Sequence, residues 1–227
     1  MSEIKTIICF ANSVKHKARC IVGREIFPGG YIGGWIRPIG DREHGEILRS
    51  ECQYQDGEIP ELLDVIRLPL ISHKPKLHQP ENWVVGGKKW VKIGKYDFDK
   101  ATKLIENNSA EVWPHPTSKN DRIPEDFLAH IRNSVCLIKP DNNYFLLRYE
   151  EEYNGKKRRC LFRYKGVSYN LACTDPAIDW RQPTALENLN KIFQSNPPLL
   201  CISLGEIFNG YSYKLVAAVI YPKTTGE

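Results

Sequence analysis

Cationic and aromatic side chains alternate in three short segments of the chain. The first segment runs from residue 15 to residue 37, and near its end Trp35 and Arg37 would share one face of a strand. An indole beside a guanidinium can stack on a nucleic-acid base and hold a phosphate. A solvated hairpin with a core tryptophan explains the same pattern equally well. The candidate binding residues of this segment are Lys15, Lys17, Arg19, Arg24, Trp35 and Arg37.

The second segment, residues 83–93, contains Lys88, Trp90 and Lys92, which strand alternation places on one face. A cation–indole–cation row is typical of platforms that bind single strands, because the cations follow the backbone and the rings stack on bases. In the alternative interpretation, the following helix covers Trp90 and the lysines serve solubility. All three residues are candidates for nucleic-acid binding.

The third segment, residues 156–165, has six cationic residues among ten and no acidic one. As a strand it would turn Cys160, Phe162 and Tyr164 toward a core. The outward candidates are then Arg159, Arg163 and Lys165. The acidic run 150–152 lies just before this segment, so a hairpin would bring the two charge runs together. Mutual neutralisation is therefore the competing interpretation.

Motifs for catalysis and metal binding are absent or weak. The sequence has no GxxxxGK[ST] phosphate loop, no HExxH and no GxSxG. Asp175, in a Thr-Asp-Pro turn, suits a turn cap better than a general base. We expect no metal and no cofactor, since the residues of metal-ligand type lie in polar loops where solvated charge is usual. Those residues are Asp41, His44, Glu46, His73 and His78.

The elements that must position these residues are mostly short strands. Segments rich in β-branched residues and punctuated by Gly and Pro predict ten of them. They are 4–10, 19–26, 35–39, 62–71, 90–93, 135–139, 144–149, 160–164, 199–204 and 213–221. Helical spacing is scarce and predicts three short helices, at 97–107, 124–133 and 184–194. The fold class is therefore mainly β, with a few short helices.

The chain has a candidate boundary between Trp113 and Asp121, where Pro, Ser and Asn gather. It predicts two small β-barrels in tandem, at 1–115 and 122–227. A Lys-x-Arg-Cys-aliphatic echo at 17–21 and 157–161 agrees with this division. A duplicated barrel explains both observations.

Composition sets the broad class. The 227 residues carry a net charge of +5, which favours an anionic partner only where the charges cluster. The longest apolar run has seven residues, far short of a membrane span, and the N-terminus lacks a signal pattern. Seven well-separated cysteines, without a CxxC pair, predict reduced thiols in the core. We expect a cytoplasmic protein that does not bind membranes.

Several short motifs resemble those of the bacterial dual OB domain family. The segments are 8–15, 19–23 and 34–38, followed by Leu171-Ala172-Cys173-Thr174-Asp175-Pro176. The resemblance spans nearly the whole chain. It implies two OB-type β-barrels in tandem, a role in handling nucleic acid, and involvement in bacterial conflict with phage. It implies no catalytic residue.

The leading hypothesis is a protein without enzymatic activity that binds DNA or RNA, in single-stranded form, through grooves on two barrels. The cations would supply affinity and the tryptophans stacking. The second hypothesis is an enzyme acting on nucleic acid or a nucleotide through Asp41, His44, Asp175 or a reactive cysteine such as Cys20. The third is an adaptor that binds a protein partner, because small barrels serve many functions.

Overall fold

The computed structural model describes residues 3–15, 17–106, 111–113, 120–152 and 155–222, with the side chains of Lys15 and Glu152 left out. The chain forms two compact units. The first comprises Met1–Ala101 and Ala129–Ser134, and the second comprises Thr102–Leu128 and Val135–Glu227. The predicted barrel ranges, 1–115 and 122–227, differ from these units in the placement of 102–115 and 129–134, and they stay a prediction.

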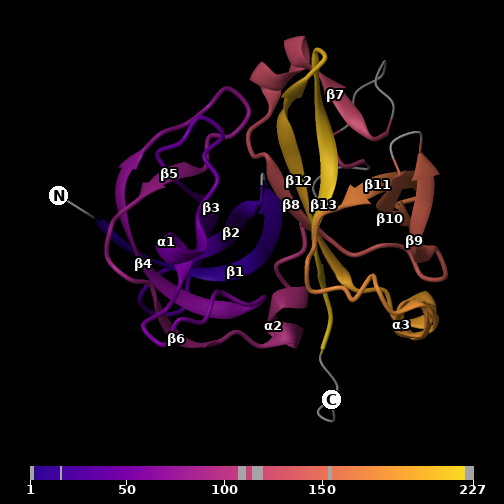
Figure 1. Cartoon of the computed structure of the whole chain (residues 1–227), viewed down its shortest axis with the longest axis horizontal. Coiled ribbons are helices and arrows are strands. Elements are labelled where there is room, and N and C mark those ends of the chain that lie inside the picture. The colour runs from indigo at the N-terminus through magenta and orange to yellow at the C-terminus, as the bar shows by residue number, and fades with distance from the viewer. Residues whose placement is uncertain (1–2, 16, 107–110, 114–119, 153–154, 223–227) are drawn as a thin grey trace. The chain divides into compact units, whose positions relative to one another are not determined.

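The first unit is a small β-barrel with two short helices. Its strands are β1 (Glu3–Lys15), β2 (Ala18–Ile26), β3 (Ile32–Ile39), β4 (Asp64–His73), β5 (Asn82–Val85) and β6 (Val91–Lys95). The helices are α1 (Arg49–Cys52) and α2 (Phe98–Thr102). The strand order is β1-β2-β3-β5-β4-β6, and an additional β1–β4 pairing closes five of the strands into a ring (Figure 1). Closure leaves those five strands without a free sheet edge.

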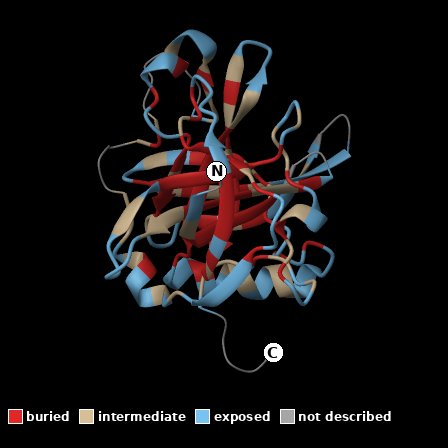
Figure 2. Ribbon diagram, turned by 90° about the vertical axis from the view of Figure 1, so that its left-hand side faces the viewer, coloured by how far each residue is buried: buried red, intermediate tan, exposed pale blue. Residues whose placement is uncertain are grey.

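Alternation along the strands fills the core of this barrel. Ile7 and Cys9 of β1, Ile21 of β2 and Ile66 of β4 are fully buried in one cluster with Trp90. Side chains at every second position of a strand point to the same face, so a run of alternating apolar residues produces a continuous core. Buried residues accordingly gather along the central strands (Figure 2), whereas β6 is exposed along its length.

The second unit has a seven-stranded sheet and a longer helix. Its strands are β7 (Arg122–Pro124), β8 (Val135–Ile138), β9 (Phe145–Glu152), β10 (Gly155–Tyr164), β11 (Val167–Cys173), β12 (Leu199–Phe208) and β13 (Tyr211–Ile220). The helical elements are α3 (Pro183–Ser195) and the 3₁₀ helix η1 (Glu125–His130), whose last two residues belong to the first unit. The order is β8-β12-β13-β11-β10-β9, with β7 paired to β13. Phe193 of α3 packs edge-on against Phe145, with ring centroids 5.3 Å apart.

The two units share one strand plan. In the first, β1 pairs with both β2 and β4, and β3 runs parallel to β5. In the second, β9 pairs with β10, β8 pairs with β12, and β11 runs parallel to β13. The pair β8 and β9 therefore takes the place of the single long strand β1. The Lys-x-Arg-Cys echo falls at β2 and at β10, which hold the same position in this plan.

The mainly-β prediction is confirmed, with all ten predicted strands present in part or whole. Three strands were missed: β5, β7 and β11. The first two are short, at four and three residues. β11 has a Ser and an Asn on its outward face, which weakens its apolar signal. The predicted helices at 97–107 and 124–133 are shorter in the structure, and the second is a 3₁₀ helix.

Asp175 caps a turn inside the second unit. One carboxylate oxygen accepts a hydrogen bond from Ala177 N at 2.8 Å, and the other accepts one from Val219 N at 2.8 Å. The residue is 2% exposed, and this burial raises the pKa of its carboxyl group. Because both oxygens are occupied by the backbone, Asp175 stabilises the turn, in agreement with the turn-cap interpretation.

Candidate functional site

The outward-facing side chains of β9, β10 and β11 form a cationic surface, which we call the outer face. Alternation defines it, because Cys160, Phe162 and Tyr164 of β10 are buried, as the sequence predicted. Among its described side chains, four are cationic and one is anionic, so the face carries net positive charge. The charged members are Arg148, Lys157, Arg159, Arg163 and Glu150.

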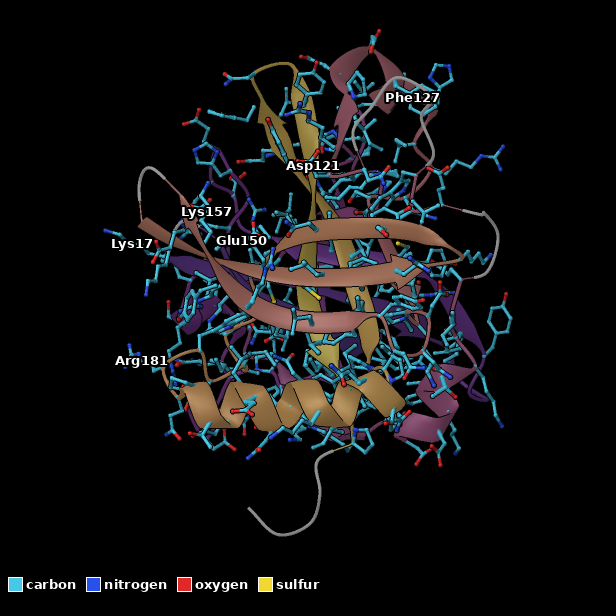
Figure 3. The ribbon with its side chains drawn as sticks, turned by 90° about the vertical axis from the view of Figure 1, so that its right-hand side faces the viewer. Lys17, Asp121, Phe127, Glu150, Lys157 and Arg181 are labelled. Carbon is cyan, nitrogen blue, oxygen red and sulfur yellow. The ribbon has the colours of Figure 1, made fainter. Side chains whose placement is uncertain are left out.

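Figure 3 views this unit from the side on which β9, β10 and β11 lie, with Glu150 and Lys157 labelled. These two residues are register partners on β9 and β10, and Arg148 is the partner of Arg159. Register partners lie side by side on the same face of a sheet. The three strands therefore hold the charged side chains in one continuous surface.

Arg163 and Tyr144 form a stacked pair at one end of the outer face. The guanidinium carbon lies 3.9 Å from the centroid of the Tyr144 ring, and Tyr144 is 49% exposed. The backbone fixes this geometry, because Arg163 N donates to Tyr144 O at 3.0 Å. A planar cation on an exposed ring offers two surfaces on which a base can stack, beside a charge for its phosphate.

Glu150 lies at the centre of a polar cluster near the other end. Arg148 Nη2 donates to its Oε1 at 2.5 Å, and Asn170 Nδ2 donates to the same oxygen at 2.9 Å. Arg159 Nε lies 3.3 Å from Oε2. The hydrogen bond from Arg148 is the main cause that lowers the pKa of the Glu150 carboxyl group. Three neighbouring strands thus each place a cationic or polar side chain beside one anion, two of them through hydrogen bonds and Arg159 through an ion pair.

The expected meeting of the acidic and basic runs is confirmed. β9 and β10 pair antiparallel, so Glu151 lies opposite Lys156 and Glu150 opposite Lys157. Neutralisation is partial, since the Lys156–Glu151 pair spans 3.9 Å at exposed positions and such pairs contribute little. Arg163 interacts with a ring, which leaves its charge in place. Lys165 follows β10 in a turn, with a φ of 49°, and is exposed.

A second cation–aromatic group belongs to β7 and the β12–β13 hairpin. The Arg122 guanidinium lies 4.7 Å from the Tyr211 ring centroid, and its Nη1 donates to Tyr213 Oη at 3.4 Å. Phe208, near the tip of the hairpin, is 65% exposed. Small barrels that bind oligonucleotides use loops of this kind beside a strand face.

The structure contradicts the exposed positions expected for Trp35 and Arg37. Trp35 is 5% exposed, because the Phe10 ring packs edge-on against it at 5.8 Å and the Arg24 guanidinium lies 5.3 Å from its centroid. Arg37 is 4% exposed and forms an ion pair with Glu81, Nε to Oε1 at 3.2 Å. Both faces of β3 are buried, so alternation cannot bring these side chains to the surface.

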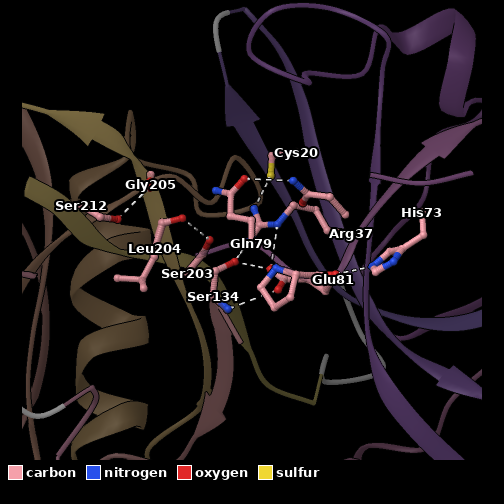
Figure 4. Close-up of polar contacts among 12 residues, drawn as sticks. Cys20, Arg37, His73, Gln79, Glu81, Ser134, Ser203, Leu204, Gly205 and Ser212 are labelled. Carbon is pink, nitrogen blue, oxygen red and sulfur yellow. Dashed lines mark hydrogen bonds and ion pairs between the residues drawn. The ribbon is translucent and has the colours of Figure 1, made fainter. Parts of the chain in front are cut away.

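Arg37 belongs to a buried polar network in the first unit (Figure 4). Its Nη2 donates to Ser134 Oγ at 2.6 Å, and its Nη1 lies 3.3 Å from Cys20 Sγ. Ser134 also hydrogen-bonds to Glu81 through its hydroxyl and backbone groups. The chain itself supplies these partners, so the buried guanidinium is hydrogen-bonded and its charge is balanced within the barrel.

The remaining candidates of the first segment belong to β1, β2 and the turn between them. Lys15 ends β1 in register with Ala18, and Lys17 lies in the intervening turn with a φ of 64°. This turn interrupts the alternation expected between Lys17 and Arg19, and the side chain of Lys15 lies outside the described part of the chain. Arg24 Nε donates to Gly33 O at 2.7 Å.

The cation–indole–cation row is also contradicted. β5 ends at Val85 and β6 begins at Val91, so Lys88 and Trp90 lie outside any strand. Trp90 is 0% exposed and occupies the barrel core. Lys92 Nζ lies 2.9 Å from Asp64 Oδ1. Burial tends to raise the pKa of Asp64, but the Glu61 N–H, Lys92 and other donors lower it overall, which keeps this carboxylate charged. Lys88 is exposed.

The residues considered for catalysis or metal binding lie apart. Asp41 forms an exposed ion pair with Lys74 at 3.0 Å. His73 Nε2 contacts Pro80 O at 2.5 Å, and its ring lies 4.9 Å from Trp83. Within the described ranges, no three His, Cys, Asp or Glu residues are grouped as a metal site would require. All seven cysteines are thiols, and five are buried.

Lys214 is a buried amine within the second unit. Its Nζ donates to Trp113 O at 3.3 Å and lies 5.7 Å from the Tyr169 ring centroid. Burial lowers its pKa from 10.5 to about 8. Between these values the unfolded chain holds a proton that the folded chain has lost, so the unfavourable contribution of Lys214 at pH 7 fades as the pH rises through this window.

We expect the substitution Lys214→Met to raise the free energy of unfolding by about 2 kcal/mol at pH 7, because it removes a buried charge. The advantage over the wild type should shrink as the pH rises from 8 to 10. Urea unfolding of both proteins at pH 7, 8 and 9 measures this difference. Both proteins contain the same cysteines, so the effect of cysteine titration cancels when the two are compared. A pH-independent difference would contradict the role assigned to Lys214.

The comparison with protein families agrees with the duplicated strand plan. The family model described as a dual OB-containing domain matches residues 5–219. The chain belongs to this family. The suspected resemblance is therefore confirmed, as is the fold of two small OB-like barrels with few short helices. No curated protein matches the chain. In the described part of this dual OB-containing domain, no helix has both the length and the apolarity that a membrane crossing needs.

Sequence reasoning missed three members of the outer face: Tyr144, Arg148 and Asn170. The alternation of Tyr144, Leu146, Arg148 and Glu150 was a usable signal, because it places an aromatic and a cation on one side of a strand. Asn170 gave no such signal, since β11 was not predicted. In this dual OB-containing domain, the third segment is the one whose outward cations Arg159 and Arg163 reach an accessible sheet face.

Proposed function

We propose that this dual OB-containing domain binds single-stranded nucleic acid through the outer face of its second unit. The observation that supports the proposal is the combination of Arg148, Arg159 and Arg163 with the exposed ring of Tyr144 on three adjacent strands. Cations so placed release counterions from phosphates, and exposed planar groups stack on unpaired bases.

The first unit supports this role less well. On its corresponding strands, the side chains that lie outside the cluster of Ile7, Ile21 and Ile66 include Phe10, Val22 and Trp35, which are at most 5% exposed. Of the cations there, Arg37 is buried beside Glu81. An apolar, buried face offers a nucleic acid neither charge nor an accessible ring. We therefore assign binding to the second unit.

An unpaired strand suits the site better than a duplex. Stacking on the Arg163–Tyr144 pair needs bases whose flat faces are accessible, and a duplex hides them. Two further expectations belong to the same proposal: a cytoplasmic location, and the role in bacterial conflict with phage that the resemblance implies. The choice between DNA and RNA follows from the experiment below.

Fluorescence anisotropy with labelled oligonucleotides tests the proposal. Single-stranded DNA, single-stranded RNA and a duplex of the same sequence would be titrated between 50 and 300 mM salt. We expect tighter binding to a single strand, with log K falling against log salt at a slope of about −2, as for three phosphate contacts. Absence of binding at 50 mM salt, or binding that ignores salt, would reject the proposal.

A further inference from the structure

The carboxylate of Glu150 occupies the centre of a built anion site. Its three partners are Arg148 Nη2 at 2.5 Å, Asn170 Nδ2 at 2.9 Å and Arg159 Nε at 3.3 Å. They come from β9, β11 and β10, so the sheet itself fixes the spacing of the donors. The contacts of Arg148 and Asn170 are hydrogen bonds, and that of Arg159 is an ion pair. Guanidinium and amide groups that converge in this way suit an oxyanion with two accessible oxygens.

A phosphodiester has the same recognition chemistry as this carboxylate. Each presents two oxygens that share a negative charge, and arginine is the preferred partner of both. Glu150 is an occupant that belongs to the chain, and its side chain remains 23% exposed. It can therefore swing toward solvent without unfolding the strand.

We infer that Glu150 is an internal substitute for a phosphate, and that the backbone of a bound strand displaces it from Arg148, Arg159 and Asn170. The inference rests on the proposed function for the identity of the strand. Its consequence is regulatory: the carboxylate competes with the ligand and weakens binding at this position. In the absence of a bound strand, the carboxylate thus holds Arg148, Arg159 and Asn170 in the arrangement that a phosphate would need.

The substitution Glu150→Gln tests the competition. It removes the charge and retains the length of the side chain, so a strand should bind about fivefold more tightly, as for the loss of one competing ion pair. Glu151→Gln is the matched control, because it makes the same charge change on the same strand at a side chain 85% exposed. Anisotropy titration at 100 mM salt compares the two variants.

Equal affinities of the two variants would overturn the inference, since Glu150 would then act as one more surface charge. Weaker binding by Glu150→Gln would also overturn it, because the carboxylate would then serve to position the arginines. Thermal melting of each variant verifies folding. If Glu150→Gln does not fold, Glu150→Asp replaces it, and the shorter carboxylate should likewise tighten binding above the level of the control.

A phosphate titration separates this inference from the proposed function. Inorganic pyrophosphate would be added to the Glu150→Gln protein while the Nε–H resonances of Arg148 and Arg159 and the side-chain amide of Asn170 are followed by NMR. We expect these signals to shift more than in the Glu151→Gln control. Shifts without oligonucleotide binding would reject the proposed function alone. Oligonucleotide binding without these shifts would reject the phosphate site alone.

Discussion

Replacing Trp90 with alanine is expected to lower the free energy of unfolding by about 3–5 kcal/mol, the usual cost of deleting a large buried side chain. Trp90 is fully buried in the core of the first unit, among residues that include Ile7, Ile21 and Ile66. Deleting the indole leaves a cavity that closed, paired strands cannot collapse to fill. Urea unfolding followed by circular dichroism measures the loss.

Trp90→Phe is the matched control. Within the described residues, the Trp90 Nε1 has no hydrogen-bond partner, so phenylalanine removes an unsatisfied buried donor while filling most of the volume. We expect this variant to lose no more than about half as much stability. Neither substitution should change the oligonucleotide affinity of the folded protein. Reduced affinity of a fully folded Trp90→Phe protein would show that the ring contacts the nucleic acid after all.

The strands of this fold were largely predictable, because alternation is a local property of the sequence. The face to which each strand turns its polar residues was harder to predict. Trp35 and Arg37 alternate as expected, yet both are buried, because β3 has neighbours on both faces. Arg37 is balanced by Glu81, which lies 44 residues later in the chain. No local sequence pattern predicts an ion-pair partner so far along the chain.

The error at Trp90 has a different cause. The prediction applied strand alternation from residue 88 to residue 92, but β5 ends before Gly86 and Gly87, and the chain reaches Trp90 outside a strand. Where the chain is not a strand, the alternation of Lys88, Trp90 and Lys92 does not tell which side chains point to the core and which to the solvent. A tryptophan between two lysines is then equally compatible with a core residue, and burial of its large apolar area favours the core.

The third segment was predicted more accurately because its apolar residues identify its inner face. Cys160, Phe162 and Tyr164 alternate with Arg159, Leu161 and Arg163 over a real strand, so the direction of the cations follows. The acidic run that precedes it was also foreseen as a hairpin partner. The sequence did not predict that side chains from three strands meet at Glu150, because one of those strands, β11, was itself not predicted.

The outer face should lose its affinity for nucleic acid when its arginines are neutralised together. The variant Arg148→Gln, Arg159→Gln, Arg163→Gln keeps the aliphatic stems and removes three charges from one surface. Binding of a single strand should weaken by about 30-fold to 300-fold near 100 mM salt, which is about 2 to 3.4 kcal/mol for the three lost phosphate contacts together. The slope of log K against log salt should approach zero.

The matched control removes the same net charge from exposed lysines elsewhere: Lys74→Gln, Lys100→Gln, Lys191→Gln. Side-by-side anisotropy titrations of the two triple variants, with folding verified by thermal melting, test directly whether this one face binds the strand. We predict a loss of at least about tenfold for the arginine variant relative to the lysine variant. Equal affinities would show that binding follows overall charge, and would contradict a site on β9, β10 and β11.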